Sequence, residues 1–411
     1  MTSPRPAKRS GPVALPDGGL ANEVLEFVWR RRTASRADIA RHTGRSRSTI
    51  SEVVARLLPT GLIEEVGSGE SRGGRRPILI GFRDSASGIL GMDIGAAHVS
   101  VALTDLRGRI LQWRRRDHPV QTDPRGTAAL AMALAEECLA SRGTGSPPPM
   151  GIGVAVPSPV DPGSPYRILE RILPAWHDFD LLGALRAHFE VPVFVDNDAN
   201  LGALAEHHWG KAVGIDDFAY LKVATGIGAG LMIDGEIYRG ATGVAGEIGH
   251  VAIDPRGPRC VCGNRGCLAT FVGTRALVDR TRTLLCDFPE SVLAGTVPDI
   301  RALEDAALAD DPLALKVVGE AARNLGIVIA GVLNLMNPGS VILGGSLARI
   351  GERLIAPLSK AVASRTLVAS AAASEIRTSE LGPRATALGA ATHVLVAALA
   401  DPILFPGVKA P

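Results

Sequence analysis

Hydrophobic residues near the N-terminus of the chain recur with a helical spacing, whereas beyond about residue 83 they also form short apolar runs. The first part predicts three helices, over residues 22–32, 36–42 and 47–58, because apolar residues recur there every three or four positions. Ser35 and Ser46 stand directly before the second and third helices, where a serine side chain can cap free backbone N–H groups.

The spacing of small and branched residues in the second and third helices is typical of a helix-turn-helix. Ala40 lets the helices approach, Gly44 suits a left-handed turn, and Ile50 anchors the third helix. The outward first turn of the third helix then offers donors for phosphates and base edges in a major groove. The candidate DNA-contacting residues are Arg45, Arg47, Ser48, Thr49 and Ser51.

Two short predicted strands, 62–66 and 78–80, flank a loop that is rich in Gly and Arg. Arginines on such a loop can enter a minor groove or hold phosphates, as in a wing. The arginines in question are Arg72, Arg75 and Arg76. An ordinary three-helix module with a charged loop is the alternative. Charge, spacing and loop together favour a winged helix-turn-helix over residues 20–83.

Charge divides the chain at the same place. Of the 44 basic and 42 acidic residues, 15 basic and 9 acidic lie within residues 1–85, so this part is positive and the remainder is negative. A basic module on an acidic body favours a polyanionic partner for the first module. Residues 1–19 are rich in Pro, Gly and Arg, and we expect a disordered tail there.

The length of 411 residues predicts two or three domains. No apolar run is long enough to span a bilayer, so no membrane partner is expected. The basic N-terminus lacks the hydrophobic segment of a secretory signal. We therefore expect a cytoplasmic protein without disulfides, since three of its five cysteines fit a metal site described below.

Beyond residue 83, short apolar runs alternate with helical patterns, which is typical of an α/β protein. The predicted strands are 88–95, 99–105, 110–113, 150–156, 191–195, 218–223, 228–233 and 337–345. The predicted helices are 127–139, one that opens within 196–200 and ends near 209, 275–285, 312–335 and 385–399.

Metal-ligating residue types are concentrated in one Gly- and Pro-rich segment. They are His250, Cys260, Cys262 and Cys267. Zn²⁺ prefers four thiolate or imidazole ligands, and Gly permits tight turns between them. A redox dithiol or a set of buried free cysteines is the alternative. Cys-x-Cys, with a third Cys five residues on and a His upstream, favours a structural Zn²⁺ site.

Polar residues follow two of the predicted strands. Asn197 and Asp198 lie where a strand ends and a helix begins. Ligands of open α/β sheets bind beyond the carboxyl ends of strands, so these two side chains are placed to hold vicinal hydroxyls. Simple helix capping is the alternative. Asp93, followed by Gly95 at another strand end, suits a phosphate-contacting turn.

The joined motifs Gly-Glu-x-Gly-His and Cys-x-Cys-Gly-x-x-Gly-Cys resemble the signature of the ROK family, which contains sugar kinases and sugar-responsive repressors. The resemblance covers residues 20–400. It implies an α/β fold in which the winged helix-turn-helix is followed by a two-lobed actin-like (ribonuclease H-like) ATPase-type domain. Its first lobe would span residues 86–205 together with a C-terminal helix, 385–400, and its second lobe residues 206–384.

The resemblance also implies roles for individual residues. The metal would be structural, and Glu247 and His250 would contact sugar hydroxyls beside Asn197 and Asp198. In ROK kinases the Asp that matches Asp198 deprotonates the hydroxyl that attacks ATP. The family usually has a Glu that contacts the sugar where this chain has Ala269.

The phosphate-contacting turn departs from the kinase pattern Asp-x-Gly-Gly-Thr-Lys. Here the turn reads Asp93-Ile94-Gly95-Ala96-Ala97-His98. The second Gly and the Thr hydroxyl, which approach the ATP phosphates in kinases, are missing. This departure opposes kinase activity and is of the type seen in the family's repressors.

We therefore expect a sugar-responsive DNA-binding regulator, in our interpretation a repressor, without a catalytic residue. It would bind operator DNA and a sugar or sugar phosphate as a homodimer or homotetramer. One alternative is an ATP-dependent sugar kinase with an appended DNA-binding domain, which Asp198 as catalytic base and the Gly344-Gly345 turn favour. Another is a regulator that senses a phosphorylated partner protein.

Overall fold

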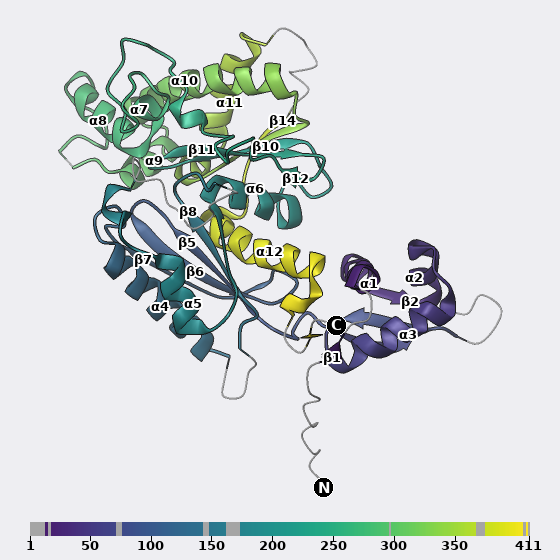
Figure 1. Cartoon of the computed structure of the whole chain (residues 1–411). Coiled ribbons are helices and arrows are strands. Elements are labelled where there is room, and N and C mark those ends of the chain that lie inside the picture. Colours follow the sequence, from purple (N-terminus) through teal and green to yellow (C-terminus); the bar gives the residue numbers. More distant parts are fainter. Residues whose placement is uncertain are drawn as a thin grey trace.

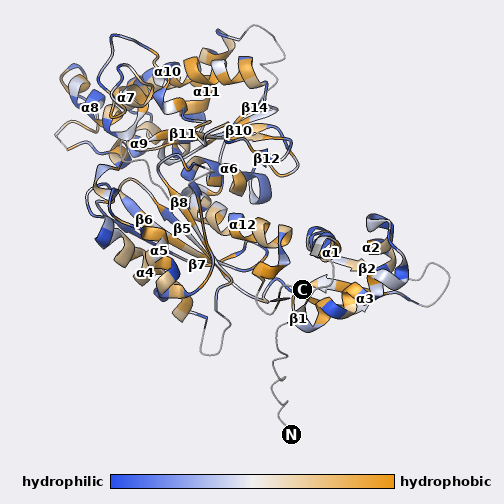
Figure 2. Ribbon diagram, in the orientation of Figure 1, coloured by the Kyte–Doolittle hydropathy of each residue, from blue (hydrophilic) through white to orange (hydrophobic). Residues whose placement is uncertain are grey.

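The computed structural model describes residues 13–14, 18–70, 76–142, 148–161, 173–295, 297–366, 375–405 and 408–409. Figure 1 shows a small N-terminal module (purple) beside two larger lobes, each built around a β-sheet. Hydrophobic residues concentrate on the strands and on the helices that cover them in each part (Figure 2). Among the described residues, no helix is long and apolar enough to cross a membrane.

The N-terminal module contains three helices and a three-stranded antiparallel sheet in the order β2-β4-β3. Its helices are α1 (Gly18–Arg31), α2 (Arg36–Thr43) and α3 (Arg47–Leu57). Its strands are β2 (Thr33–Ser35), β3 (Ile63–Ser68) and β4 (Ile78–Phe82). Three helices with an antiparallel sheet are the elements expected of a winged helix-turn-helix.

The local signals in this module act as the sequence predicts. The Ser35 hydroxyl accepts from the backbone N–H of Asp38 while the Asp38 carboxylate accepts from the backbone N–H of Ser35, which makes a capping box. Ser46 caps α3 by accepting from the backbone N–H of Thr49, and Gly44 turns the chain at φ 65°.

Two predictions for the module need correction. Helix α1 begins at Gly18, so the tail predicted for residues 1–19 overlaps the helix, and residues 1–12 lie outside the described part of the chain. Strand β2 was not predicted, because three residues between two helices carry no alternation to detect. Tertiary pairing with β4, in the register Ser35 to Leu79, forms it.

The first lobe has a five-stranded sheet in the order β7-β6-β5-β8-β9. These strands are β5 (Ile89–Ile94), β6 (His98–Thr104), β7 (Ile110–Asp117), β8 (Ile152–Val156) and β9 (Val193–Asn197). Its helices are α4 (Pro124–Ala140), α5 (Leu181–Phe189) and α12 (Ala385–Ala400). Helix α12 lies close against β8, since a Cβ on Gly153 would stand 1.8 Å from the Ala390 carbonyl oxygen.

The second lobe has another five-stranded sheet, in the order β12-β11-β10-β13-β14. The strands are β10 (Phe218–Val223), β11 (Ile227–Ile233), β12 (Glu236–Ile237), β13 (Ser340–Gly344) and β14 (Glu375–Thr378). The helices are α7 (Ala269–Val272), α8 (Thr274–Leu284), α9 (Ile300–Leu308), α10 (Pro312–Met336) and α11 (Glu352–Ala363). The sequence predicted α8 and α10 within a residue of their ends, but α5, α9, α11, β12 and β14 were missed.

Helix α6 (Asp198–Trp209) joins the parts of the molecule. It packs against α12 on one side and against β10 and β11 on the other. The lobe boundary expected after residue 205 falls inside this helix, and the domain division stays a prediction.

The N-terminal module rests on the far ends of α6 and α12. The Trp29 indole of α1 donates to the Leu106 carbonyl (2.9 Å), and its ring meets the edge of Trp209, with 6.0 Å between centroids. Trp209, the last residue of α6, donates its own indole N–H to Thr392 of α12 (2.8 Å). One hydrophobic cluster therefore runs from the module into the first lobe.

Candidate functional site

The predicted metal ligands lie together at one edge of the second lobe. The donor atoms of His250, Cys260, Cys262 and Cys267 all lie within 4.8 Å of one another. Two isolated bridges, Ala252 to Cys267 and Arg259 to Arg265, fold the loop back on itself. Gly266 permits this close return, because it has φ +69° and a Cβ there would stand 1.5 Å from the Asp254 carbonyl oxygen.

The spacing of these donor atoms fits a tetrahedral metal centre. His250 Nδ1 lies 3.5 Å from Cys260 Sγ, and Cys262 Sγ lies 3.7 Å from Cys267 Sγ. Tetrahedral bonds of about 2.3 Å to sulfur and 2.0 Å to nitrogen separate neighbouring donors by about 3.5–3.8 Å. Burial lowers the pKa of His250, which favours the neutral imidazole that binds metals. The four residues therefore match the geometry of a four-coordinate ion.

The His250 ring connects this loop to Glu247. Its Nδ1 faces the cysteines, whereas its Nε2 lies 3.8 Å from Glu247 Oε2. Burial, together with the negative charge of Asp198, raises the pKa of Glu247 to about 7. At neutral pH this carboxyl can thus donate or accept a hydrogen bond.

Opposite charges from both lobes meet beside Glu247. Lys222 of β10 donates to Asp198 at the start of α6 (2.7 Å), and its Nζ lies 3.9 Å from Asp93 of β5. The other Asp93 oxygen lies 3.0 Å from His98 Nε2. We call this group the inter-lobe polar cluster; it comprises Asp93, His98, Asp198, Lys222, Glu247 and His250.

Lys222 was not among the sequence-predicted site residues. A single lysine inside the apolar run of strand β10 was the available signal, because a buried lysine needs a charged partner. The partner could not be identified from the sequence, since Asp198 lies 24 positions away on another element.

Asn197 lies beside this cluster but is engaged in capping. Its side-chain oxygen accepts from the backbone N–H groups of Ala199 and Asn200, and its amide donates to the Ser158 carbonyl. The capping alternative therefore describes the contacts of Asn197, and its contact with a ligand stays a prediction.

The turn between β5 and β6 is closed tightly. The Gly95 N–H donates to the His98 carbonyl (2.9 Å), so Ala96 and Ala97 form a two-residue tip. Neither alanine side chain can donate a hydrogen bond to a phosphate. Ala269, the first residue of α7, likewise presents only a methyl group after the metal loop.

The predicted DNA-contacting residues of the third helix lie together on an exposed surface. Arg45, Arg47, Ser48, Thr49 and Ser51 are all exposed. Ser48 and Thr49 hydroxyls meet the Ser46 cap, and the Ser51 hydroxyl donates to the Arg47 carbonyl. These three serine and threonine hydroxyls therefore already have partners within the helix.

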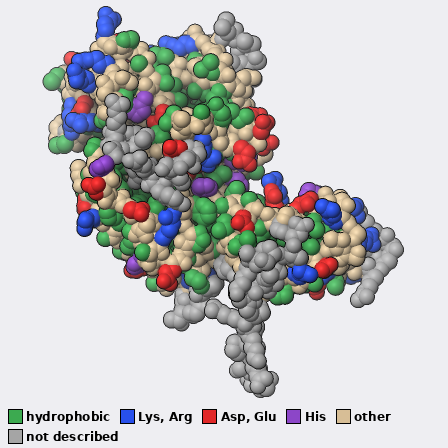
Figure 3. Space-filling view, in the orientation of Figure 1, with side chains coloured by type: hydrophobic (Ala, Val, Ile, Leu, Met, Phe, Trp, Pro, Cys, Tyr) green, Lys and Arg blue, Asp and Glu red, His purple; other side chains and the backbone are tan. Residues whose placement is uncertain are grey.

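The arginines of the N-terminal module differ in whether they form ion pairs. Arg36, Arg41 and Arg56 each pair with a carboxylate of the module. Within the described residues, Arg45 and Arg47 form no ion pair. Arg76, at the end of the predicted wing, is exposed, whereas Arg72 and Arg75 lie outside the described residues. Figure 3 shows basic side chains on the visible face of the module.

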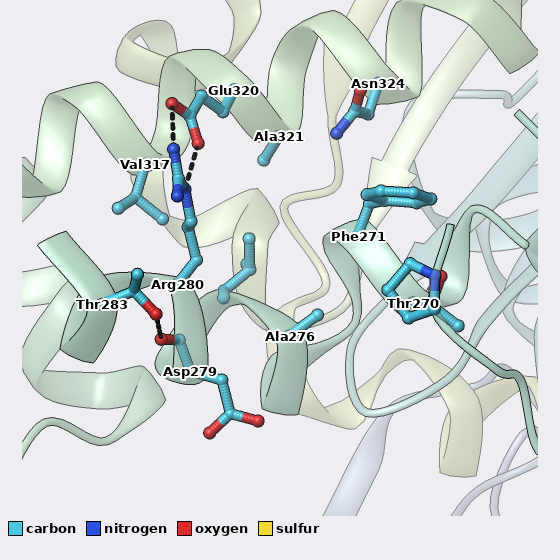
Figure 4. Close-up of a pocket in the computed structure, with 12 residues that line it drawn as sticks. Thr270, Phe271, Ala276, Asp279, Arg280, Thr283, Val317, Glu320, Ala321 and Asn324 are labelled. Atoms are coloured by element: carbon cyan, nitrogen blue, oxygen red, sulfur yellow. Dashed lines mark hydrogen bonds and ion pairs between the residues drawn. The ribbon is translucent and has the colours of Figure 1, made fainter. Parts of the chain in front are cut away.

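A separate cavity of about 540 Å³ lies between α8 and α10, next to the metal loop. Figure 4 shows Arg280 in a double hydrogen bond with Glu320 across it, with distances of 2.7 and 3.1 Å. No predicted site residue lines it.

Comparison with known proteins relates this arrangement to a family. The ROK family model matches residues 89–397. The xylose repressor of Bacillus subtilis (strain 168) is 31% identical over 374 residues, which cover 90% of this chain and 94% of that protein.

Two solved structures show how far the likeness extends. A ROK family transcriptional regulator, a homologue of the E. coli MLC protein, has a TM-score of 0.80 at 27% identity and covers 95% of this chain and 99% of its own. A ROK family glucokinase from Streptomyces griseus, in complex with glucose and AMPPNP, has a TM-score of 0.67 at 28% identity. The match covers 74% of this chain and 98% of the glucokinase chain. With its metal loop, its two sheets and these matches, the chain belongs to the ROK family.

Proposed function

We propose that this chain is a sugar-responsive, DNA-binding transcriptional regulator that represses genes of carbohydrate transport or catabolism. The main observation is that the likeness to a ROK regulator extends over 95% of the chain and so includes the N-terminal module. The glucokinase covers only 74% of the chain. A regulator of this kind acts in the cytoplasm.

In this proposal α3 enters the major groove of operator DNA. Arg45 and Arg47 would contact bases and phosphates, since they are exposed and form no ion pair with any described residue, and the hydroxyls of Ser48, Thr49 and Ser51 would add phosphate contacts. The wing arginines Arg72, Arg75 and Arg76 would hold the adjacent backbone. A homodimer or homotetramer would present two such modules to a palindromic site.

The effector would bind at the inter-lobe polar cluster. Asp198 and Glu247 would accept hydrogen bonds from sugar hydroxyls, with His250 and Asn197 beside them. Zn²⁺ would be held by His250 and the three cysteines as a structural ion, because thiolate and imidazole donors at these spacings suit it best. The ion would fix the ring of His250, whose second nitrogen faces Glu247.

Helix α6 would connect the effector site with the DNA-binding module. Its first residue, Asp198, belongs to the inter-lobe polar cluster, and its last residue, Trp209, contacts Trp29 of α1. A shift of α6 on ligand binding would thus change the position of the N-terminal module on the first lobe. In an oligomer it would also change the spacing of two such modules.

A sugar kinase with an appended DNA-binding domain is the second candidate function. The carboxylate of Asp198 and the kinase-like body favour it. The Ala96-Ala97 tip, the methyl of Ala269 and the ion pair of Asp198 with Lys222 oppose it. A catalytic base also has to be free to accept a proton, and this carboxylate is already engaged.

Genome-wide DNA occupancy of the tagged protein, with and without a panel of sugars, tests the proposal. We expect discrete palindromic sites beside sugar transport or catabolic genes, and loss of occupancy with one sugar. Absence of specific sites would favour the kinase, and ATP-dependent phosphorylation of sugars would then be measured. Specific sites that respond to no sugar would favour a phosphorylated partner protein as the signal.

A further inference from the structure

Lys222 lies largely enclosed between two carboxylates, one from β5 of the first lobe and one from the start of α6. Its side chain is 13% exposed and lies on β10, the central strand of the second sheet. Alternate residues of a strand share a face, and Tyr220 on the same face packs against Gly202 of α6. Two positions further, Lys222 therefore reaches Asp198 at the N-terminal end of the same helix.

Asp93 provides the second carboxylate and carries an unused acceptor. The residue is 3% exposed, and within the described residues its Oδ1 accepts no hydrogen bond. That oxygen faces Lys222 Nζ at 3.9 Å, while Oδ2 meets His98. Burial by itself would raise the pKa of Asp93, but Lys222 and His98 lower it to about 2. Burial would likewise lower the pKa of Lys222, but Asp198 and Asp93 raise it.

Phosphoryl chemistry at Asp198 would need the space beside this carboxylate. A hydroxyl activated by Asp198 would have to receive a phosphoryl group beside that carboxylate, and Mg²⁺ would accompany the phosphates. In this chain an ammonium already stands there. One lysine between two aspartates leaves a negative sum, so a dianionic ester would meet like charge, whereas an uncharged hydroxyl can share the lysine N–H groups.

We propose that Lys222 is a tethered cation of the effector site, which stands where a phosphoryl group and its metal ion would lie and so selects an uncharged sugar over its phosphate ester. This inference rests on the proposed sugar-responsive function. It adds a specificity-determining residue and narrows the effector class from sugar or sugar phosphate to the free sugar.

Calorimetric titration of the full-length protein tests the selectivity. The probes are D-xylose, D-glucose, N-acetyl-D-glucosamine, the 5-phosphate of the pentose and the 6-phosphates of the two hexoses, each with and without millimolar Mg²⁺. We expect one free sugar to bind, any tested ester of it to bind at least about tenfold more weakly, and Mg²⁺ to have no effect on the wild type. An ester that binds as tightly as its free sugar, or more tightly, would overturn the inference, as would binding of esters alone.

Variants separate a tethered cation from a merely structural lysine. Lys222→Met should lose affinity for the free sugar by about tenfold or more, and millimolar Mg²⁺ should restore part of it by neutralising Asp93 and Asp198. Lys222→Arg should stay within about threefold of the wild type. The surface control Lys316→Met should be unchanged. Unaltered affinity of Lys222→Met, or a loss that Mg²⁺ does not restore, would refute the tethered cation.

Thermal unfolding tests the role of Lys222 without relying on the proposed sugar response. Without any sugar, Lys222→Met should unfold at a lower temperature than the wild type, and Mg²⁺ should raise that temperature in the variant alone. If no probe binds the wild type, the sugar-responsive function fails, and the Mg²⁺ response of the variant still decides whether Lys222 is a tethered cation.

Discussion

The surface of α3 that we propose faces DNA and the inter-lobe polar cluster use charged residues in opposite ways. On α3, Arg45 and Arg47 are exposed and, in the described part of the chain, without ion pairs. In the cluster, Lys222 is buried and paired with Asp198 and Asp93. An exposed arginine stays hydrated until it binds a polyanion. The charges of a buried ion pair are already desolvated and held in place before any ligand binds.

The difference explains how one chain can read two chemically distinct partners. DNA binding gains from charges that are free to replace counterions along a phosphate backbone. Recognition of a small sugar needs acceptors held in place, because each misplaced polar group in a buried site leaves a hydrogen bond unmade. Helix α6, with Asp198 at one end and Trp209 at the other, joins the two regions.

The largest effect should come from breaking the metal loop beside the cluster. Cys262→Ser removes one of four donors, so we expect loss of the bound metal and of the ligand response. Structural zinc contributes on the order of 10 kcal/mol to small zinc-dependent folds. Here the remaining second-lobe core should keep the chain folded, because most of its residues lie on helices and strands outside the loop, although Ile248 and Leu268 beside the ligands belong to it. Metal content by mass spectrometry and operator release by ligand are the measurements.

The matched control for that variant is Cys286→Ser, an exposed cysteine outside the metal loop. It should retain metal and response. A Cys262→Ser protein that responds fully to ligand would refute the structural role of the metal.

Removing the negative charge of Asp198 should be the next largest effect. Asp198→Asn keeps the shape but weakens both the Lys222 pair and the acceptor for sugar hydroxyls. We expect sugar affinity to fall by about 1.5–3 kcal/mol, the range for hydrogen bonds to charged groups. Titration calorimetry measures it, with the exposed Asp178→Asn as control. Unchanged affinity would remove Asp198 from the effector site.

The sequence predicted those parts of the fold whose signals are local. Ser35, Gly44 and Ser46 act through neighbours within a few residues, and they appear in the structure as predicted. The clustering of the four candidate metal donors was also predictable, since Cys260 and Cys262 share one loop and only donor type and spacing matter.

The elements and contacts that were missed depend on distant partners. Among the described strands, β14 pairs only with β13. In this pairing Glu375 lies opposite Ser340, which is 35 positions earlier in the sequence. Helix α11 contains Pro357, which reads as a helix breaker in the sequence, yet the buried Leu354 and Leu358 pack this helix against the core. Lys222 was missed for a related reason. Its role depends on its ion pairs with Asp93 and Asp198, which lie on elements distant in the sequence.

On the DNA-facing side of the comparison, Arg47→Ala should weaken operator binding by about 1–3 kcal/mol and relax specificity at one base pair, if Arg47 reads a base edge. Arg56→Ala on the same helix is the control, because Arg56 is already paired with Glu52. Fluorescence anisotropy at several salt concentrations measures both variants. Equal loss on specific and random DNA, with a smaller salt slope, would assign Arg47 to a phosphate instead.

The smallest effect should appear where the two regions are joined. Trp209→Leu removes the ring contact with Trp29 and the hydrogen bond to Thr392, at the end of α6 away from the effector site. We expect sugar affinity and operator affinity, each measured alone, to change little, while their coupling falls by about 0.5–2 kcal/mol. The coupling is the ratio of operator affinities with and without saturating sugar. Because linkage is reciprocal, the ratio of sugar affinities with and without operator has to fall by the same factor. A variant that keeps the full coupling would show that the signal reaches the module by another route, of which α12 with its contact to α1 is the nearest.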